Sequence, residues 1–121
     1  MLLGFYFLVV IMYNSLSFEP KKHQLSIALD YDETFTADRE LWINFVVLAK
    51  GSNHKVTFVT YRFDNGLNAD IIEDAYHLKI PIIFTGGKQK STCFKADIWI
   101  DDNPIIIPSI EVMGDFYDKN L

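Results

Sequence analysis

The sequence predicts an α/β fold built on a parallel sheet. From residue 21 onward, short apolar runs alternate with stretches of helical periodicity, which is typical of consecutive βα units. The length of 121 residues fits one domain, and a hydrophobic content of 50% is too high for a disordered chain. We therefore expect three layers, with a sheet of about four to five strands flanked by helices.

The elements follow one another in a regular order. Strands are predicted at residues 25–29, 55–60, 80–85 and 96–100, and a last strand near 105–107 or 110–112, where Pro104 and Pro108 interrupt the pattern. Helices are predicted at residues 38–50, 68–78 and 88–95. Asp38 can cap the first helix and Gly51 can end it.

The N-terminus differs from the rest of the chain. Residues 1–13 carry no charge, and the first side chain that is charged at neutral pH is Glu19. This stretch is too short for a spanning helix, which needs about 20 residues. It is interpreted as a mis-assigned start at Met12, as a signal or anchor with Ser15-Leu16-Ser17 as a cleavage site, or as an extra packed element. Residues 1–20 are therefore set apart as a leader, and residues 21–121 form the folded domain.

Charge and cysteine content restrict the partners. Eleven basic and 16 acidic residues give a net charge of -5, which argues against a protein that coats nucleic acid. The single cysteine, Cys93, excludes an internal disulfide and a zinc site of several thiolates, and it fits a reducing compartment. We expect a cytoplasmic protein; export or membrane tethering through residues 1–17 is the alternative, and a homo-oligomer is left open.

Candidate site residues gather where the predicted strands end. They come in four groups along the chain: Asp30 and Asp32, Thr60 and Arg62, Lys88 and Lys90, and Asp101 and Asp102. The carboxyl ends of parallel strands share one edge of a sheet, so these side chains should meet in one crevice. Four neighbouring carboxylates raise one another's pKa unless a cation lies among them, and oxygen ligands favour Mg²⁺.

Three other kinds of site fit the sequence less well. An EF-hand loop starting at Asp30 would need different residues at Thr34, Phe35 and Leu41. A P-loop would need Gly where Ile82 stands and Ser or Thr where Gln89 stands. A response-regulator receiver domain has its paired acids early and its lysine last, whereas an acidic pair closes this series.

The segment Asp30-Tyr31-Asp32-Glu33-Thr34 resembles the DxDx[TV] nucleophile motif of the haloacid dehalogenase (HAD) superfamily. Thr60, then Lys88 or Lys90, then Asp101-Asp102 match the remaining motifs in family order. The resemblance covers about residues 25–104. It implies a Rossmann-like core and an Mg²⁺-dependent phosphohydrolase.

The resemblance also implies roles for these residues. Asp30 would be the nucleophile that forms an aspartyl-phosphate, and Asp32 would be the general acid and base and would offer its main-chain carbonyl to the metal. The metal would be held by Asp30 with Asp101, Asp102 or both, Asp102 being the better match. Thr60 and one of the two lysines would bind phosphate, with Arg62 as a second phosphate contact; the sequence does not choose between Lys88 and Lys90.

The distances between the motifs along the chain limit the kind of substrate. Only 25 residues separate Thr34 from Thr60 and 27 separate Thr60 from Lys88, so neither gap holds a cap domain of the kind that many HAD enzymes carry. A capless phosphomonoesterase is expected, acting on a small-molecule or macromolecular phosphoester. The alternatives are a non-catalytic module that binds phosphate or protein, and a nucleic-acid end phosphatase.

Overall fold

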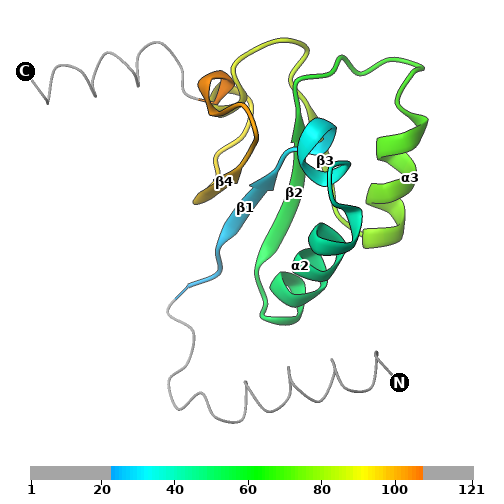
Figure 1. Cartoon of the computed structure of the whole chain (residues 1–121). Helices are drawn as coiled ribbons and strands as arrows, with labels where there is room; N and C mark the ends of the chain where they lie inside the picture. Colours follow the sequence, from blue (N-terminus) through cyan, green and yellow to red (C-terminus); the bar gives the residue numbers. More distant parts are fainter. Residues whose placement is uncertain (1–22, 108–121) are drawn as a thin grey trace, which may run out of the picture.

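The computed structural model describes residues 23–107, which form an α/β fold around a four-stranded parallel sheet (Figure 1). The strands are β1 (Ser26–Leu29), β2 (Lys55–Thr60), β3 (Ile82–Phe84) and β4 (Ile98–Ile100). The sheet order is β3-β2-β1-β4, and Ala28 of β1 pairs with Thr57 on one side and Trp99 on the other. The predicted α/β class and four of the predicted strands are confirmed, with β1, β3 and β4 shorter than expected.

The strand order determines where a ligand can bind. The chain builds β1, β2 and β3 outward in one direction and then returns to place β4 on the free side of β1. The order therefore reverses between β1 and β4, and open α/β sheets bind ligands outside the carboxyl ends of the strands at such a point. A receiver-type sheet would instead place β1 between β2 and β3, so the topology excludes that alternative.

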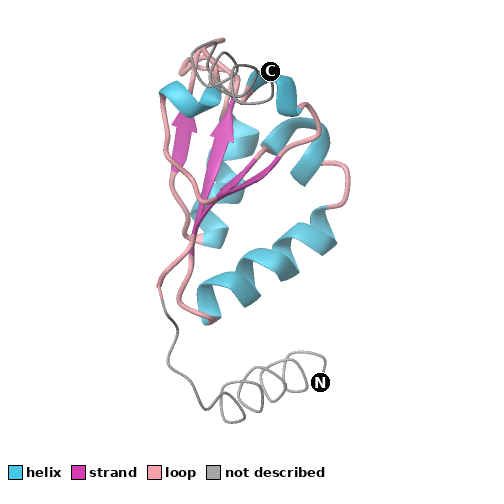
Figure 2. Cartoon of the chain, turned by 90° about the vertical axis from the view of Figure 1, so that its left-hand side faces the viewer, coloured by secondary structure: helices cyan, strands magenta, loops and turns pink. Residues whose placement is uncertain are grey.

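Two α-helices cover one face of the sheet (Figure 2). They are α2 (Arg39–Gly51) and α3 (Ala69–Leu78). As predicted, Asp38 caps α2, because its carboxylate accepts from the Leu41 N–H at 3.1 Å. The buried residues of both helices pack with alternate residues of the two central strands to form the core: Ile27, Leu29, Val46, Ala49, Val56, Phe58, Ile71 and Ala75.

The predicted helix at residues 88–95 is wrong. Gly86 and Gly87 have positive φ and Gln89 is extended, so a helix cannot start at Lys88. The chain makes only the short 3₁₀ turn η2 (Lys90–Thr92) before it enters β4. Within residues 23–107, no α-helix covers the second face of the sheet, so the third layer expected from the sequence is absent from these residues. On that face the ring of Phe94 packs edge-on against Trp99.

The end of the described chain also differs from prediction. Residues 104–106 form the 3₁₀ turn η3 (Pro104–Ile106) rather than a strand, because proline at the first position has no N–H to give to a sheet. The alternative strand at 110–112 and the leader at residues 1–20 lie outside the described residues. Between residues 23 and 107, neither α-helix has the length and hydropathy that crossing a bilayer requires.

Candidate functional site

A buried lysine joins two aspartates at the carboxyl end of the sheet. Asp30 follows β1, and its N–H donates to the Ile100 carbonyl of β4 at 2.9 Å, which places it at the reversal of strand order. Lys90 of η2 is fully buried; its Nζ donates to Asp30 Oδ1 at 2.8 Å and to Asp101 Oδ2 at 2.5 Å. One ammonium group thus binds two carboxylates, those of Asp30 and Asp101, which lie 60 residues before and 11 residues after Lys90 in the sequence.

Thr34 links Asp102, the second acid after β4, to Asp30. Its Oγ1 lies 3.1 Å from Asp30 Oδ2 and 3.1 Å from Asp102 Oδ1, and it accepts from the Asp102 N–H at 3.1 Å. A hydroxyl has a single hydrogen, so Thr34 donates to one of the two carboxylates at a time. It therefore keeps Asp30 and Asp102 close without neutralising either.

Three carboxylates converge here in a geometry that can hold a cation. One oxygen each from Asp30, Asp101 and Asp102 lies within 4.8 Å of the other two. With Lys90 the ionised cluster carries a net charge of -2. Burial raises the pKa of Asp30 to about 6, with Asp102 adding to the rise and Lys90 opposing it, whereas hydrogen bonding to Asp30 and Thr34 lowers the pKa of Asp102.

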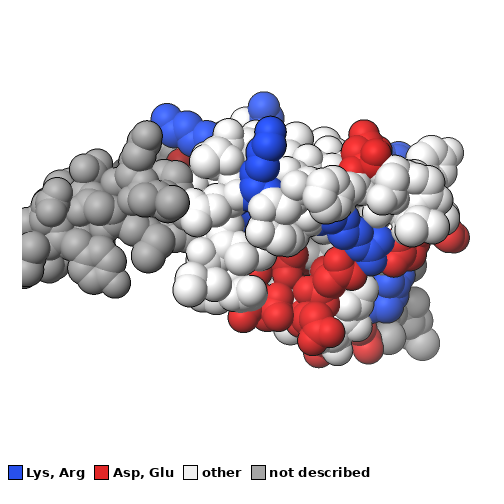
Figure 3. All heavy atoms as spheres, turned by 90° about the horizontal axis from the view of Figure 1, so that it is seen from above, with Lys and Arg blue, Asp and Glu red and all other residues white. Residues whose placement is uncertain are grey.

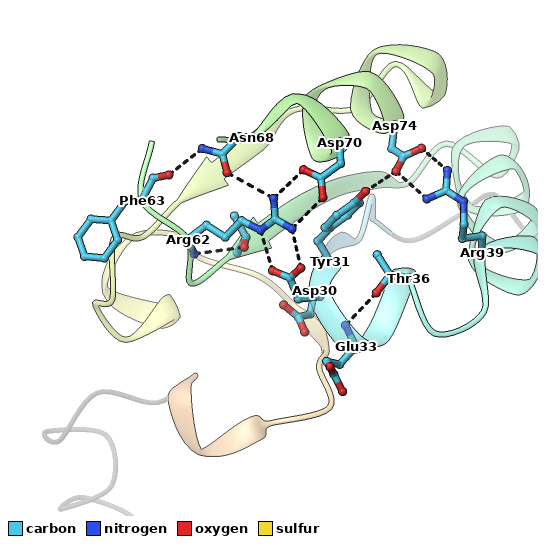
Figure 4. Close-up of polar contacts among 12 residues, drawn as sticks. Asp30, Tyr31, Glu33, Thr36, Arg39, Arg62, Phe63, Asn68, Asp70 and Asp74 are labelled. Carbon is cyan, nitrogen blue, oxygen red and sulfur yellow. Dashed lines mark hydrogen bonds and ion pairs between the residues drawn. The ribbon is translucent and has the colours of Figure 1, made fainter. Parts of the chain in front are cut away.

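Asp32 belongs to a different cluster. Its two oxygens accept from Nε and Nη2 of Arg62 at 2.8 and 2.6 Å. The same guanidinium donates to Asp70 at 2.7 and 2.9 Å (Figure 4). Arg62 is thereby held between the loop after β1 and the first turn of α3. This pairing lowers the pKa of Asp70 to about 2 and raises that of Arg62.

The other two predicted residues lie apart from the carboxylates. Thr60 is buried at the end of β2, and its Oγ1 accepts from the Arg62 N–H at 3.2 Å, which shapes the loop that carries the arginine. Lys88 is exposed, and no carboxylate in the described part of the chain lies within ion-pair distance of it. Of the two lysines that the sequence left open, the structure brings Lys90 to the acids.

A third cluster fixes the loop between the two DxD acids and was not found by sequence reasoning. Tyr31 is buried, and its hydroxyl donates to Asp74 of α3 at 2.5 Å. Arg39 holds the same carboxylate through two N–H groups (Figure 4). Asp74 stands four residues after Asp70 on α3, so an acidic pair with helical spacing was the available signal.

The loop itself is a wide, π-type turn, η1 (Tyr31–Phe35). The Phe35 and Thr36 N–H groups donate back to the carbonyls of Asp30 and Tyr31, and Glu33 has a positive φ of 66°. This turn returns Thr34 beneath Asp30. The role of Thr34 was also missed as a separate site residue, although its place in the DxDxT string was noticed.

Two open pockets flank the clusters on the face where the strands end, where acidic side chains gather beside Lys and Arg (Figure 3). One, of about 320 Å³, is lined by Thr34, Trp42, Asp101 and Asp102 among others. The second, of about 360 Å³, is lined by Arg62, Phe63, Asn65, Leu67, Asn68 and Asp70. The clusters are therefore reachable from solvent on two sides.

Comparison with models of protein families, with curated proteins and with solved structures finds no match to this chain.

Proposed function

We propose that the protein is an Mg²⁺-dependent phosphomonoesterase of the HAD type that works through an aspartyl-phosphate on Asp30. The observation that carries the proposal is the convergence of Asp30, Asp101 and Asp102 around buried Lys90, at the reversal of strand order. Strongly perturbed pKa values cluster at functional sites, and the raised pKa of buried Asp30 fits that pattern.

The residues present fit a magnesium ion. All three converging groups are carboxylates, which are hard oxygen ligands, and the net charge of -2 on the cluster matches a divalent cation. The Thr34 hydroxyl contacts two of the three carboxylates and can orient them, as hydrogen-bonding groups that surround the ligands of a metal do. When bound, Mg²⁺ would neutralise charge on the phosphoryl oxygens.

The chain's own residues supply the remaining chemistry. A carboxylate oxygen of Asp30 attacks phosphorus while the bond to the leaving oxygen breaks, and Asp32 gives that oxygen a proton. A water then attacks the phosphoryl group, its proton passes to Asp32, and phosphate and free Asp30 are released. Lys90 supplies positive charge beside the attacking carboxylate, and the Thr60 hydroxyl donates to a phosphoryl oxygen.

Asp32 must loosen its contact with Arg62 to play this part. Both of its oxygens accept from the guanidinium, and a carboxyl that carries a proton can accept fully with only one of them. This pairing is also the specific observation that favours the second candidate, a module that binds phosphate without turning it over. The two candidates predict different results for hydrolysis.

The decisive experiment measures release of p-nitrophenol from p-nitrophenyl phosphate with Mg²⁺ and with EDTA. We expect turnover only with the metal, and a loss of about a thousandfold or more in Asp30→Asn. The matched control is Asp64→Asn, the same chemical change at an exposed acid outside the clusters. Equal activity in wild type and Asp30→Asn would refute the assignment, and phosphate binding without turnover would favour the binding module.

A further inference from the structure

The pocket beside Arg62 shares that residue with Asp32, the acid that faces the leaving group in the proposed function. In the proposed function Asp32 protonates the leaving oxygen, and Asp32 is fixed by Arg62, which lines this pocket. A leaving group departs opposite the attacking carboxylate and next to its acid. The pocket near Trp42 lies instead against the metal-facing acids Asp101 and Asp102.

Two of its six lining residues are large apolar side chains that face solvent. Phe63 is 63% exposed and Leu67 is 85% exposed, and Tyr61 on the same loop is 44% exposed. Large apolar side chains this open beside a charged site are typical of surfaces that bind an apolar or aromatic group. Asn65 and Asp70 add polar atoms to the rim.

The Phe63 ring is held in place before any ligand arrives. It rests on Gly86 and Gly87, where an added Cβ atom would come within 3.3 and 3.7 Å of the ring. The backbone under it is fixed, because the Gly86 N–H donates to the Arg62 carbonyl at 3.0 Å and the Asn68 amide donates to the Phe63 carbonyl at 2.7 Å (Figure 4). A preformed ring face costs little ordering entropy when it stacks.

We propose that this pocket receives the aromatic part of the leaving group, such as the base of the nucleoside that is released from a nucleoside monophosphate; this ring stacks on Phe63 and is covered by Leu67. This rests on the proposed function and adds the substrate class to it. The volume of about 360 Å³ is in the range of small-molecule sites. Stacking on an exposed aromatic ring tolerates any base, so selectivity is expected for aromatic over aliphatic esters rather than for one base.

The test compares kcat/KM for AMP, p-nitrophenyl phosphate and glycerol phosphate in the wild type, Phe63→Ala and Leu67→Ala. We expect the preference for both aromatic esters over glycerol phosphate to fall about tenfold in Phe63→Ala, mainly through KM. Loss of preference for AMP alone would identify a nucleoside as the ligand, and equal loss for both would identify a simple ring. Tyr76→Ala, which removes an even more exposed aromatic side chain on α3, is the control.

A second measurement separates this proposal from the proposed function. Adenosine, which has no phosphate, is titrated into the protein, and amide NMR shifts are expected at residues 61–68. If adenosine shifts these amides but the protein hydrolyses no ester, the pocket assignment stands and the proposed phosphatase activity is refuted. The pocket near Trp42 is the alternative place for the aromatic group, and Ala37 also lines it. Hydrolysis with an unchanged preference in Phe63→Ala, or a loss of preference in Ala37→Leu, would refute the assignment of the pocket beside Arg62 without refuting the phosphatase.

Discussion

Replacing Lys90 by methionine should be the most damaging single change in the cluster. Methionine has nearly the length of lysine, so it fills the same space but removes the ammonium group. The side chain of Lys90 has no exposed surface, and those of its partners Asp30 and Asp101 are 9% and 2% exposed. Little water can therefore replace the lost ion pairs.

The size of the effect follows from this burial. Breaking a buried ion pair from one side costs about 3–5 kcal/mol, because an uncompensated charge remains inside. Here one ammonium group serves two carboxylates, which argues for the upper part of that range. Since single domains unfold with about 5–15 kcal/mol, the variant should be close to the limit of folding.

The assay is urea unfolding at neutral pH followed by Trp42 and Trp99 fluorescence in Mg²⁺-free buffer. Lys88→Met is the matched control, the same change two residues earlier at an exposed position, and should stay within about 0.5 kcal/mol of wild type. If Lys90→Met unfolds at the same urea concentration as this control, the buried lysine does not hold the acids together.

A double-mutant cycle separates the ion pair from simple packing. Asp30→Asn removes one of the two charges that Lys90→Met leaves unpaired, so the double variant should lose less stability than the two single variants added together. Coupled buried partners show interaction energies of about 0.5–3 kcal/mol. Additive losses would mean that Lys90 contributes through its hydrocarbon chain alone.

Three more changes test other parts of the site. Arg39 lowers the pKa of Asp74 from its usual 3.8, so the ionised carboxylate of Asp74 adds stability above that pH, and this stability is lost as the pH falls through the lowered pKa. The urea midpoint of Asp74→Asn should therefore change less with pH in this acidic range than that of wild type, and an unchanged slope would refute the pairing. Gly86→Ala meets both a positive φ of 61° and the Phe63 ring, so its melting temperature should drop by a few degrees, about 1 kcal/mol of stability. Thr34→Val removes an outer contact of two carboxylates and should weaken Mg²⁺ binding about 10–100-fold by calorimetry, and equal affinity would contradict the metal arrangement.

The parts of the fold that the sequence predicts are those set by local chemistry. Apolar runs identify β1, β2 and β4, and the capping aspartate Asp38 identifies the start of α2, because these depend on neighbours along the chain. Polar residues directly after strands are also local signals, which is why Asp30 and Asp101 could be assigned to the same edge.

The contacts across the sheet could not be predicted in the same way. Asp30 lies close to Asp101 because β4 pairs with β1. Nothing in the sequence of either strand indicates which strand its partner will be. Lys90 rather than Lys88 contacts the acids because the chain is extended at Gln89 and then forms a tight turn. The sequence pattern of residues 88–95 predicted a helix instead and so did not indicate which lysine points to the acids. Arg62 and Asp70 form an ion pair only because α3 starts above the end of β2.

The electrostatics of the cluster itself argue for a ligand. Even with Lys90 in contact, burial holds the pKa of Asp30 near 6, against a usual value of 3.8. Keeping Asp30 ionised at neutral pH therefore costs the fold about 3 kcal/mol. A cation that binds among the three carboxylates would offset this cost, because it relieves the repulsion between them that is already present in the folded protein.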